Sequence, residues 1–283
     1  ALSVDMLRLT GDPRVADEIE WSTLNAALGA IPYGGTTSSY SNPPDGLRNY
    51  GNEIRGQAPN AGPDLNCCST NACRGPGMIA LWALMAGGDG APYLNYYGPG
   101  TFAMRLPSGN RLTIEQQTDY PADGRVALSV GLERPERFPL ALRIPAWSTH
   151  TTVRVNGAAV DKPVEPGAYL ALDRTWTSGD AVEIDFDVTL RTVAGEGPFA
   201  GKRSVFRGPL LLAYDARFGG ANADDPPPLE ASGLSFERRT YSGSIPPWLI
   251  GVLRDGLGKE YPVCDYSSAG QTGNAYRSWL PMR

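Results

Sequence analysis

The hydrophobic pattern of the chain changes its period near residue 88, and this change limits the possible folds more than any other feature. Before it, Val15, Ile19 and Leu24 recur at the spacing of one helix face. After it, apolar residues alternate with polar ones, most clearly from Val182 to Leu190, which predicts one half-buried strand. The pattern therefore predicts a helical part followed by antiparallel strands.

Two helices are predicted in the first part. Asp12-Pro13 is typical of an N-cap followed by proline in the first turn, and this helix should end at Gly29. A second should follow Ser69-Thr70, with one apolar face and an end at Gly87-Gly88; that face would hold Ile79, Trp82, Met85 and Ala86.

The chain begins with a helical pattern as well. Leu2, Met6 and Leu9 have helical spacing from the first residues onward. No initiator Met, charged segment or cleavage site precedes them, so the start resembles neither a signal peptide nor a natural beginning. We expect that sequence upstream of Ala1 is missing.

The second part contains turn signals at short intervals, as hairpins require. The signals are Pro107-Ser108-Gly109-Asn110, Asp123-Gly124, Asn156-Gly157 and Ser178-Gly179-Asp180. Ser204 to Tyr214 predicts a further strand pair, broken at Arg207-Gly208-Pro209, and a last strand-like piece runs from Tyr276 to Leu280. The expectation is two antiparallel β-sandwich domains, at 88–192 and 193–283, after a helical part at 1–87.

Charge and hydropathy exclude several classes of function. No apolar run approaches the roughly 20 residues that cross a bilayer, so a membrane span is not expected. The formal net charge of −5 and pI near 5.0 make nucleic acid and anionic membranes poor partners, and a neutral substrate fits better. The chain is expected to be soluble, and its compartment stays unknown because no targeting segment is visible.

The adjacent cysteines Cys67 and Cys68 are the sharpest chemical feature. Neighbouring Cα atoms lie about 3.8 Å apart, below the usual disulfide range, so the two thiols can bridge each other only with strain. At the start of a helix they suit zinc, whose charge favours thiolate, and a thiolate is also a nucleophile. The alternatives are two small buried apolar side chains, or pairing of each cysteine elsewhere.

Other candidates are weaker. The long segment from Tyr33 to Leu65 has the length of a functional loop. Its carboxylates could act on a glycosidic oxygen and its aromatic rings could stack on sugars, although surface or packing roles explain each one singly; these are Asp45, Glu53 and Asp64, and Tyr33, Tyr40 and Tyr50. By contrast, Asp17, Glu18 and Glu20 are expected to be solvated or capping. The sole histidine, His150, receives no role.

An ordered set of motifs resembles one family. Cys67-Cys68-Ser69-Thr70-Asn71 resembles the Cys-Cys-x-x-Asn signature of the β-L-arabinofuranosidases, glycoside hydrolase family 127 and relatives. Further motifs agree in order along nearly the whole chain; they include Ser39-Tyr40-Ser41-Asn42-Pro43, Thr118-Asp119-Tyr120-Pro121, Leu142-Arg143-Ile144-Pro145-Ala146-Trp147 and Arg207-Gly208-Pro209-Leu210. The resemblance implies that residues 1–87 are the last helices and active-site loop of an α/α toroid, which makes the expected fold mixed and mainly β.

The resemblance also implies a chemistry. Cys67 would attack the anomeric carbon of an arabinofuranoside or related oligosaccharide, and Cys68 would bind Zn²⁺ beside it, with the metal also holding Cys67. Tyr40 and Asn71 would bind the sugar. Cys73 has no place in this motif; it would be a third ligand or an incidental buried thiol.

The same resemblance implies that part of the site is absent. In that family the acid/base glutamate and the remaining zinc ligands precede the segment that Ala1 to Asn25 matches. The chain alone would then be inactive, and a second chain carrying the N-terminal half could supply the rest. Two alternatives remain: a non-catalytic carbohydrate-binding or interaction protein built from the sandwiches, and a structural zinc protein.

Overall fold

The computed structural model describes residues 1–283 except 36–37, 40–41, 49–70, 220–222 and 224. The chain is mainly β, with few helices and several antiparallel sheets. It forms two compact units, each made of two separate stretches of chain. The first unit contains residues 1–20 and 77–189, and the second contains residues 21–76 and 190–283. The predicted division into domains at residues 87 and 192 stays a prediction.

Two helices begin the first unit, α1 (Leu2–Thr10) and α2 (Pro13–Ser22). The last two residues of α2 belong to the second unit. Asp12 caps α2 as predicted, because its carboxylate accepts the backbone N–H of Arg14 at 2.9 Å. The helices pack against the short helix α5 (Ile79–Trp82) in one apolar cluster that contains Trp82. This cluster fixes the inner face of α2.

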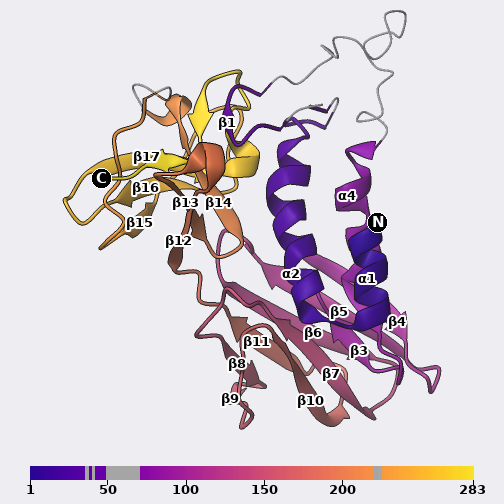
Figure 1. The fold of residues 1–283 in the computed structure, drawn as a ribbon. Coiled ribbons are helices and arrows are strands. Elements are labelled where there is room, and N and C mark those ends of the chain that lie inside the picture. The colour runs from indigo at the N-terminus through magenta and orange to yellow at the C-terminus, as the bar shows by residue number, and fades with distance from the viewer. Residues whose placement is uncertain (36–37, 40–41, 49–70, 220–222, 224) are drawn as a thin grey trace, which may run out of the picture. The chain divides into compact units, whose positions relative to one another are not determined.

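Two sheets make up the rest of the first unit (Figure 1). The four-stranded sheet has the order β10 (Ala168–Trp176), β7 (Glu136–Ile144), β3 (Pro92–Leu94), β2 (Leu84–Ala86). The six-stranded sheet has the order β4 (Gly100–Arg105), β5 (Arg111–Thr118), β6 (Arg125–Leu132), β11 (Ala181–Asp185), β8 (Thr152–Val155), β9 (Ala158–Ala159). Their arrangement as a sandwich stays a prediction.

Alternation of buried and exposed side chains confirms the strand predicted from Val126 to Leu132. In β6 the apolar side chains of Val126, Leu128 and Val130 are buried, and the residues between them are exposed. Each predicted turn joins two strands; the turn at Asn156-Gly157 has positive φ at both residues, 51° and 80°, as a tight hairpin requires. The turn signals of the sequence therefore marked connections between strands correctly.

The second predicted helix ends early. Trp82 is its last residue, and Leu84–Ala86 is the strand β2, paired with β3. The prediction of helix through Ala86 was wrong because Ile79, Trp82 and Met85 all reach one apolar cluster, and so short an apolar run cannot distinguish a helix from a strand. Gly87 instead begins the hairpin turn, where its N–H donates to Ala91 at 2.8 Å.

Helix α1 confirms the expected helix, but its apolar stripe faces outward. Leu2 and Leu9 are 77% and 85% exposed, whereas Val4 and Leu7 fill the core. Helical spacing alone does not say which of two apolar faces is buried. Leu2, Met6 and Leu9 are named here the outer stripe.

Gly124 in the turn before β6 offers a test of the packing. A Cβ there would lie 2.2 Å from the carbonyl oxygen of Phe186, whose own N–H donates to the Gly124 carbonyl. We expect Gly124→Ala to destabilise the first unit by about 1–3 kcal/mol, through overpacking. Gly88→Ala is the control, since nothing lies within 4 Å of its Cβ position. Equal urea midpoints for the two variants would contradict the packing described here.

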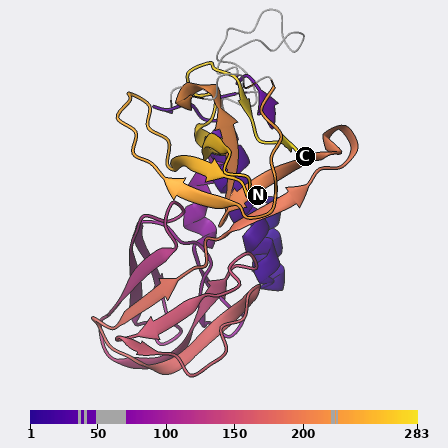
Figure 2. The same ribbon diagram turned by 90° about the vertical axis from the view of Figure 1, so that its left-hand side faces the viewer.

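The second unit is built on a nine-stranded sheet (Figure 2). Its main path is β1 (Asp45–Gly46), β18 (Tyr276–Arg277), β14 (Leu210–Asp215), β17 (Glu260–Asp265), β16 (Ile250–Arg254), β15 (Ser235–Arg238). Off this path, β13 (Lys202–Arg207) pairs with β12 (Leu190–Ala194), with β14 and with β19 (Leu280–Pro281).

Short helical turns complete the second unit. They are the π-helical η1 (Thr23–Ala27), which continues α2, the short helix α4 (Arg74–Gly77), whose last residue belongs to the first unit, and the 3₁₀ turns η2 (Gly197–Phe199), η3 (Ala216–Phe218) and η4 (Tyr266–Ser268). The predicted pair around Arg207-Gly208-Pro209 is confirmed as β13 and β14. The last predicted piece is present as two short strands, β18 and β19.

The strand predicted from Val182 to Leu190 is two strands. β11 ends at Asp185, and Leu190 begins β12 in the second unit. The single-strand prediction was wrong because alternation continues through the connection: Phe186 is buried although it belongs to no strand. Alternation of apolar and polar residues in the sequence indicates which side chains are buried, but it does not show that the backbone pairs with another strand.

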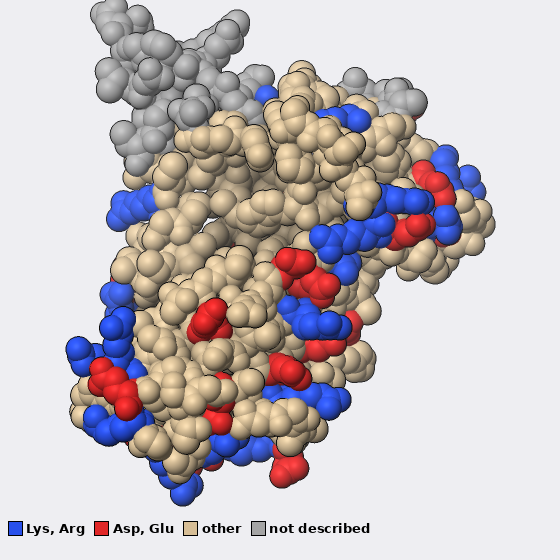
Figure 3. Space-filling model, turned by 180° about the vertical axis from the view of Figure 1, so that it is seen from behind, with Lys and Arg blue, Asp and Glu red and all other residues tan. Residues whose placement is uncertain are grey.

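Charged side chains of both signs are mixed on the face that Figure 3 shows. On the face in Figure 3, Lys and Arg lie beside Asp and Glu without a broad patch of one sign. Exposed pairs within each unit include Arg137 with Asp173 and Arg254 with Glu260. In the described ranges, no helix has the length and apolar character of a membrane span.

Candidate functional site

Only some of the predicted site residues belong to the described part of the chain. Cys67, Cys68 and Tyr40 lie outside the described residues, as do Tyr50, Glu53 and Asp64. Asn71 is described and is an exposed helical residue. Cys73 is an exposed free thiol, which corrects the expectation of a buried one.

Cys264 is the other free thiol in the described part of the chain. It is fully buried, and burial raises the pKa of its thiol well above the usual value, with Asp215 and Asp265 adding to the effect. Its Sγ lies 3.9 Å from a carboxylate oxygen of Asp215. A protonated, enclosed thiol of this kind is a packing residue.

The chain that leads into the cysteine segment is anchored in the second unit. Arg48, 3% exposed, donates to the carbonyl oxygens of Gly29 at 3.0 Å and Ser267 at 2.8 Å. Its guanidinium also lies 4.4 Å from the ring centre of Tyr266 and 5.0 Å from that of Tyr276. A cation held between two rings and several carbonyls fixes the backbone around it.

The residues just before Arg48 are held as well. Tyr266 donates to the carbonyl of Pro43 at 2.9 Å, and Asp45 accepts the backbone N–H of Ser278 at 2.8 Å. Asp45 also accepts from Trp279 at 3.1 Å, so its carboxylate ties β1 to the sheet. This use explains Asp45 without an acid/base role.

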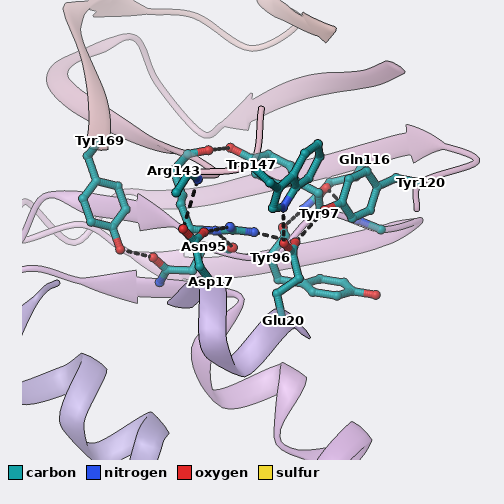
Figure 4. A network of polar contacts seen from close by, with 12 residues as sticks. Asp17, Glu20, Asn95, Tyr96, Tyr97, Gln116, Tyr120, Arg143, Trp147 and Tyr169 are labelled. Atoms are coloured by element: carbon teal, nitrogen blue, oxygen red, sulfur yellow. Dashed lines mark hydrogen bonds and ion pairs between the residues drawn. The ribbon is translucent and has the colours of Figure 1, made fainter. Parts of the chain in front are cut away.

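Asp17, which is half-buried, and Glu20, which is buried, form an ionic network in the first unit (Figure 4). Arg143 on β7 is fully buried and pairs with both carboxylates; its Nη2 donates to Glu20 Oε1 at 2.5 Å. Glu20 also accepts from Tyr120 Oη at 2.6 Å and from Trp147 Nε1 at 3.3 Å. The expectation that Asp17 and Glu20 are solvated or capping was wrong, whereas Glu18, for which the same was expected, is exposed.

The carboxylates of this network favour the charged form of Arg143. Burial alone would lower the pKa of Arg143, but Glu20 and Asp17 raise it above its usual value. Arg143 also donates through Nε to the Asn95 carbonyl at 2.7 Å. The network therefore joins α2 to β7 and leaves Glu20 enclosed by donors, which is the arrangement of a structural ion pair.

No local signal in the sequence reveals this network. Glu20 and Arg143 are separated by 123 residues, and each lies in an ordinary helical or strand pattern. The motif around Arg143 contributed to the family resemblance, but it did not indicate that Asp17 and Glu20 are the partners of Arg143.

A metal centre within the described ranges is not found: no three His, Cys, Asp or Glu side chains there gather closely enough to hold an ion. The zinc prediction depends on Cys67 and Cys68, outside those ranges. Their donor chemistry fits, since thiolates are preferred zinc ligands, but zinc is usually four-coordinate. These two residues therefore fit part of a zinc site.

Comparison with known proteins supports one family. Residues 92–188 match the model of the GH127 middle domain of β-L-arabinofuranosidases. A curated relative from Bifidobacterium longum subsp. longum, a non-reducing end β-L-arabinofuranosidase, is 30% identical over 235 residues. That alignment covers 74% of this chain and 33% of the relative, so the chain spans about one third of that protein's length.

Two solved structures share the fold. A GH127 β-L-arabinofuranosidase from Geobacillus stearothermophilus T6 has a TM-score of 0.79 and 20% identity, and a second GH127 β-arabinofuranosidase has a TM-score of 0.80 and 22% identity. Each similarity covers 99% of this chain and 48% of the other. The family model, the curated relative and the solved structures together support glycoside hydrolase family 127 for this chain, which resembles the carboxy-terminal portion of the family's members.

Proposed function

We propose that this chain carries the nucleophile of a retaining arabinofuranosidase and that Cys67 is that nucleophile. The observation that carries the proposal is the adjacent pair Cys67-Cys68 in a chain that resembles family 127. A thiolate is a strong nucleophile, and of the chain's four cysteines this pair alone has a neighbouring thiol. The substrate class is taken from the name of the Bifidobacterium relative.

The proposed reaction has two displacements. The Cys67 thiolate attacks the anomeric carbon; a C–S bond forms as the C–O bond to the leaving group breaks, and a carboxylic acid gives its proton to the departing oxygen. Water then loses a proton to the same carboxylate and attacks the anomeric carbon, which releases the thiolate. Two inversions retain the anomeric configuration.

Zinc fits this role for the cysteines. Cys68 and Cys67 would hold it, and the bound ion would keep both sulfurs deprotonated near neutral pH. Tyr40 and Asn71 would contact the sugar. The anchoring of residues 42–48 by Arg48, Tyr266 and Tyr276 supports a fixed position for the chain that enters this segment.

The acid/base carboxylate and the other zinc ligands would come from an N-terminal half, on the same or a second chain. In that protein α1 and α2 would be the last helices of an α/α toroid. The outer stripe supports the idea, because apolar side chains 77% and 85% exposed at Leu2 and Leu9 are typical of a surface that another part covers. The chain covers only 33% of its curated relative, which agrees with the proposal that another part of the protein supplies these groups.

The test compares the chain alone with the chain joined to an upstream half. With 4-nitrophenyl β-L-arabinofuranoside we expect no turnover by residues 1–283 and measurable release of nitrophenol by the joined protein. Zinc analysis should find the metal in the joined protein. Turnover by the chain alone would contradict the missing groups, while a joined protein without zinc or turnover would favour a non-catalytic carbohydrate-binding role.

A further inference from the structure

We infer that a groove in the second unit is a binding site for a neutral sugar ring. Its volume is about 330 Å³, within the range of small-molecule sites. Three stretches of chain line it: the residues after η1, the loop before β16, and η4 with the turn that follows. All of these belong to one unit.

Two exposed aromatic side chains give the groove its chemistry. Trp248 is 46% exposed and Tyr33 is 62% exposed, and both line it. A sugar ring has an apolar face of C–H groups and a rim of hydroxyls, so it stacks on aromatic rings while its hydroxyls reach polar neighbours. Gln271 and Ser268 are such neighbours.

The charge of the groove selects the ligand. None of the described residues that line it is Asp, Glu, Lys, Arg or His, although 19% of the chain is Asp, Glu, Lys or Arg. A charged ligand would lose its hydration there without an ionic partner. A neutral ring of mixed apolar and hydroxyl surface is the ligand class that matches.

The walls of the groove are held before any ligand arrives. Gln271 accepts the backbone N–H of Tyr33 at 2.9 Å and donates to the carbonyl of Ser267 at 3.1 Å, which links two walls. Arg217 links the loop before β16 to η4, because its guanidinium donates to the carbonyls of Ile245 and Ser268, both at 3.1 Å. Such preorganisation lowers the entropy that binding costs.

Rigid backbone adds to this effect. Pro32 lies in one wall, and Pro246 and Pro247 directly precede Trp248 in another. Proline fixes φ near −65°, so the chain that presents both aromatic rings has few alternative conformations. The site would hold a further sugar residue of the arabinofuranoside substrate; this identity of the sugar rests on the proposed function, whereas the groove itself does not.

The experiment is a titration of the whole chain with methyl β-L-arabinofuranoside, followed by saturation-transfer NMR of the ligand. We expect saturable binding and a Kd about tenfold higher for Trp248→Ala, the loss of one stacking contact. Trp21→Ala is the matched control, because Trp21 is equally exposed at 46% but does not line the groove. It should bind as the unchanged protein does.

A further variant tests the second aromatic ring of the groove. Tyr33→Ala should weaken binding as Trp248→Ala does, because both rings line the groove. Weakened binding by these two variants and not by Trp21→Ala supports the groove whatever the fate of the proposed chemistry. Equal effects of Trp248→Ala and Trp21→Ala, or no saturable binding, would overturn the inference. Concentration-dependent dimers that Trp248→Ala abolishes would overturn it too, since the groove would then hold a second copy.

Discussion

Replacing Cys67 with alanine in the joined protein is expected to lower kcat/KM for an arabinofuranoside by about 10⁴-fold or more, the scale seen when a covalent nucleophile is removed. The physical reason is that alanine has no electron pair to form the C–S bond, so water must attack the sugar directly. Initial rates of nitrophenol release, measured with zinc content on the same samples, check the expectation.

Cys73→Ala is the matched control for this prediction. Cys73 lies six positions along the chain, its thiol is free and exposed, and its removal should leave the rate unchanged. Cys68→Ala should lower both rate and zinc content. A Cys67→Ala protein that binds zinc and keeps a tenth of its activity or more would exclude a sulfur nucleophile.

Alkylation of the cysteines is a second test of whether the sugar binds beside Cys67. Iodoacetamide should alkylate Cys67 in the active protein, and a bound arabinofuranoside should slow that alkylation. Peptide mass analysis separates Cys67 from Cys73, whose alkylation rate should not respond to the sugar. Protection of neither thiol would place the sugar away from the cysteine pair.

Local patterns predicted several of the strands because the information they need lies within a few residues. Alternation along β6 and the paired positive φ angles at Asn156-Gly157 depend only on neighbouring side chains and backbone. The same locality explains the errors. Nothing near Met85 distinguishes the end of a helix from a strand, and alternation at Phe186 continues beyond the strand that it was taken to extend.

Only part of the candidate site could be predicted from the sequence. The cysteine pair and the family signature are local and could be found in the sequence, whereas their surroundings depend on distant contacts. Arg48 is fixed by Ser267, 219 residues away, and the groove joins Tyr33 to Gln271 across 238 residues. Such contacts form only when the sheet of the second unit brings the segments together.

The buried network at Arg143 is the clearest case, and it predicts the largest stability effect. Arg143→Met should destabilise the first unit by about 3–5 kcal/mol, since it leaves Asp17 and Glu20 without their cation. Glu20 is 1% exposed, so water cannot replace the lost partner. Urea denaturation followed by tryptophan fluorescence measures the change, because Trp147 contacts Glu20 directly.

Arg137→Met is the matched control on the same strand. Arg137 pairs with Asp173 at 3.2 Å, but the two side chains are 71% and 48% exposed, and water screens their attraction. Its urea midpoint should stay close to that of the unchanged protein. A shift for Arg143→Met no larger than for Arg137→Met would show that the network does not hold α2 to β7.

A third variant separates lost pairing from lost packing. Adding Asp17→Asn and Glu20→Gln to Arg143→Met removes the two uncompensated charges while it keeps nearly the same volume. Because an unpaired buried charge costs far more than a neutral amide in the same place, we expect this triple variant to be more stable than Arg143→Met alone. If the added amides lower stability further, packing of the arginine side chain, and not its charge, explains the effect.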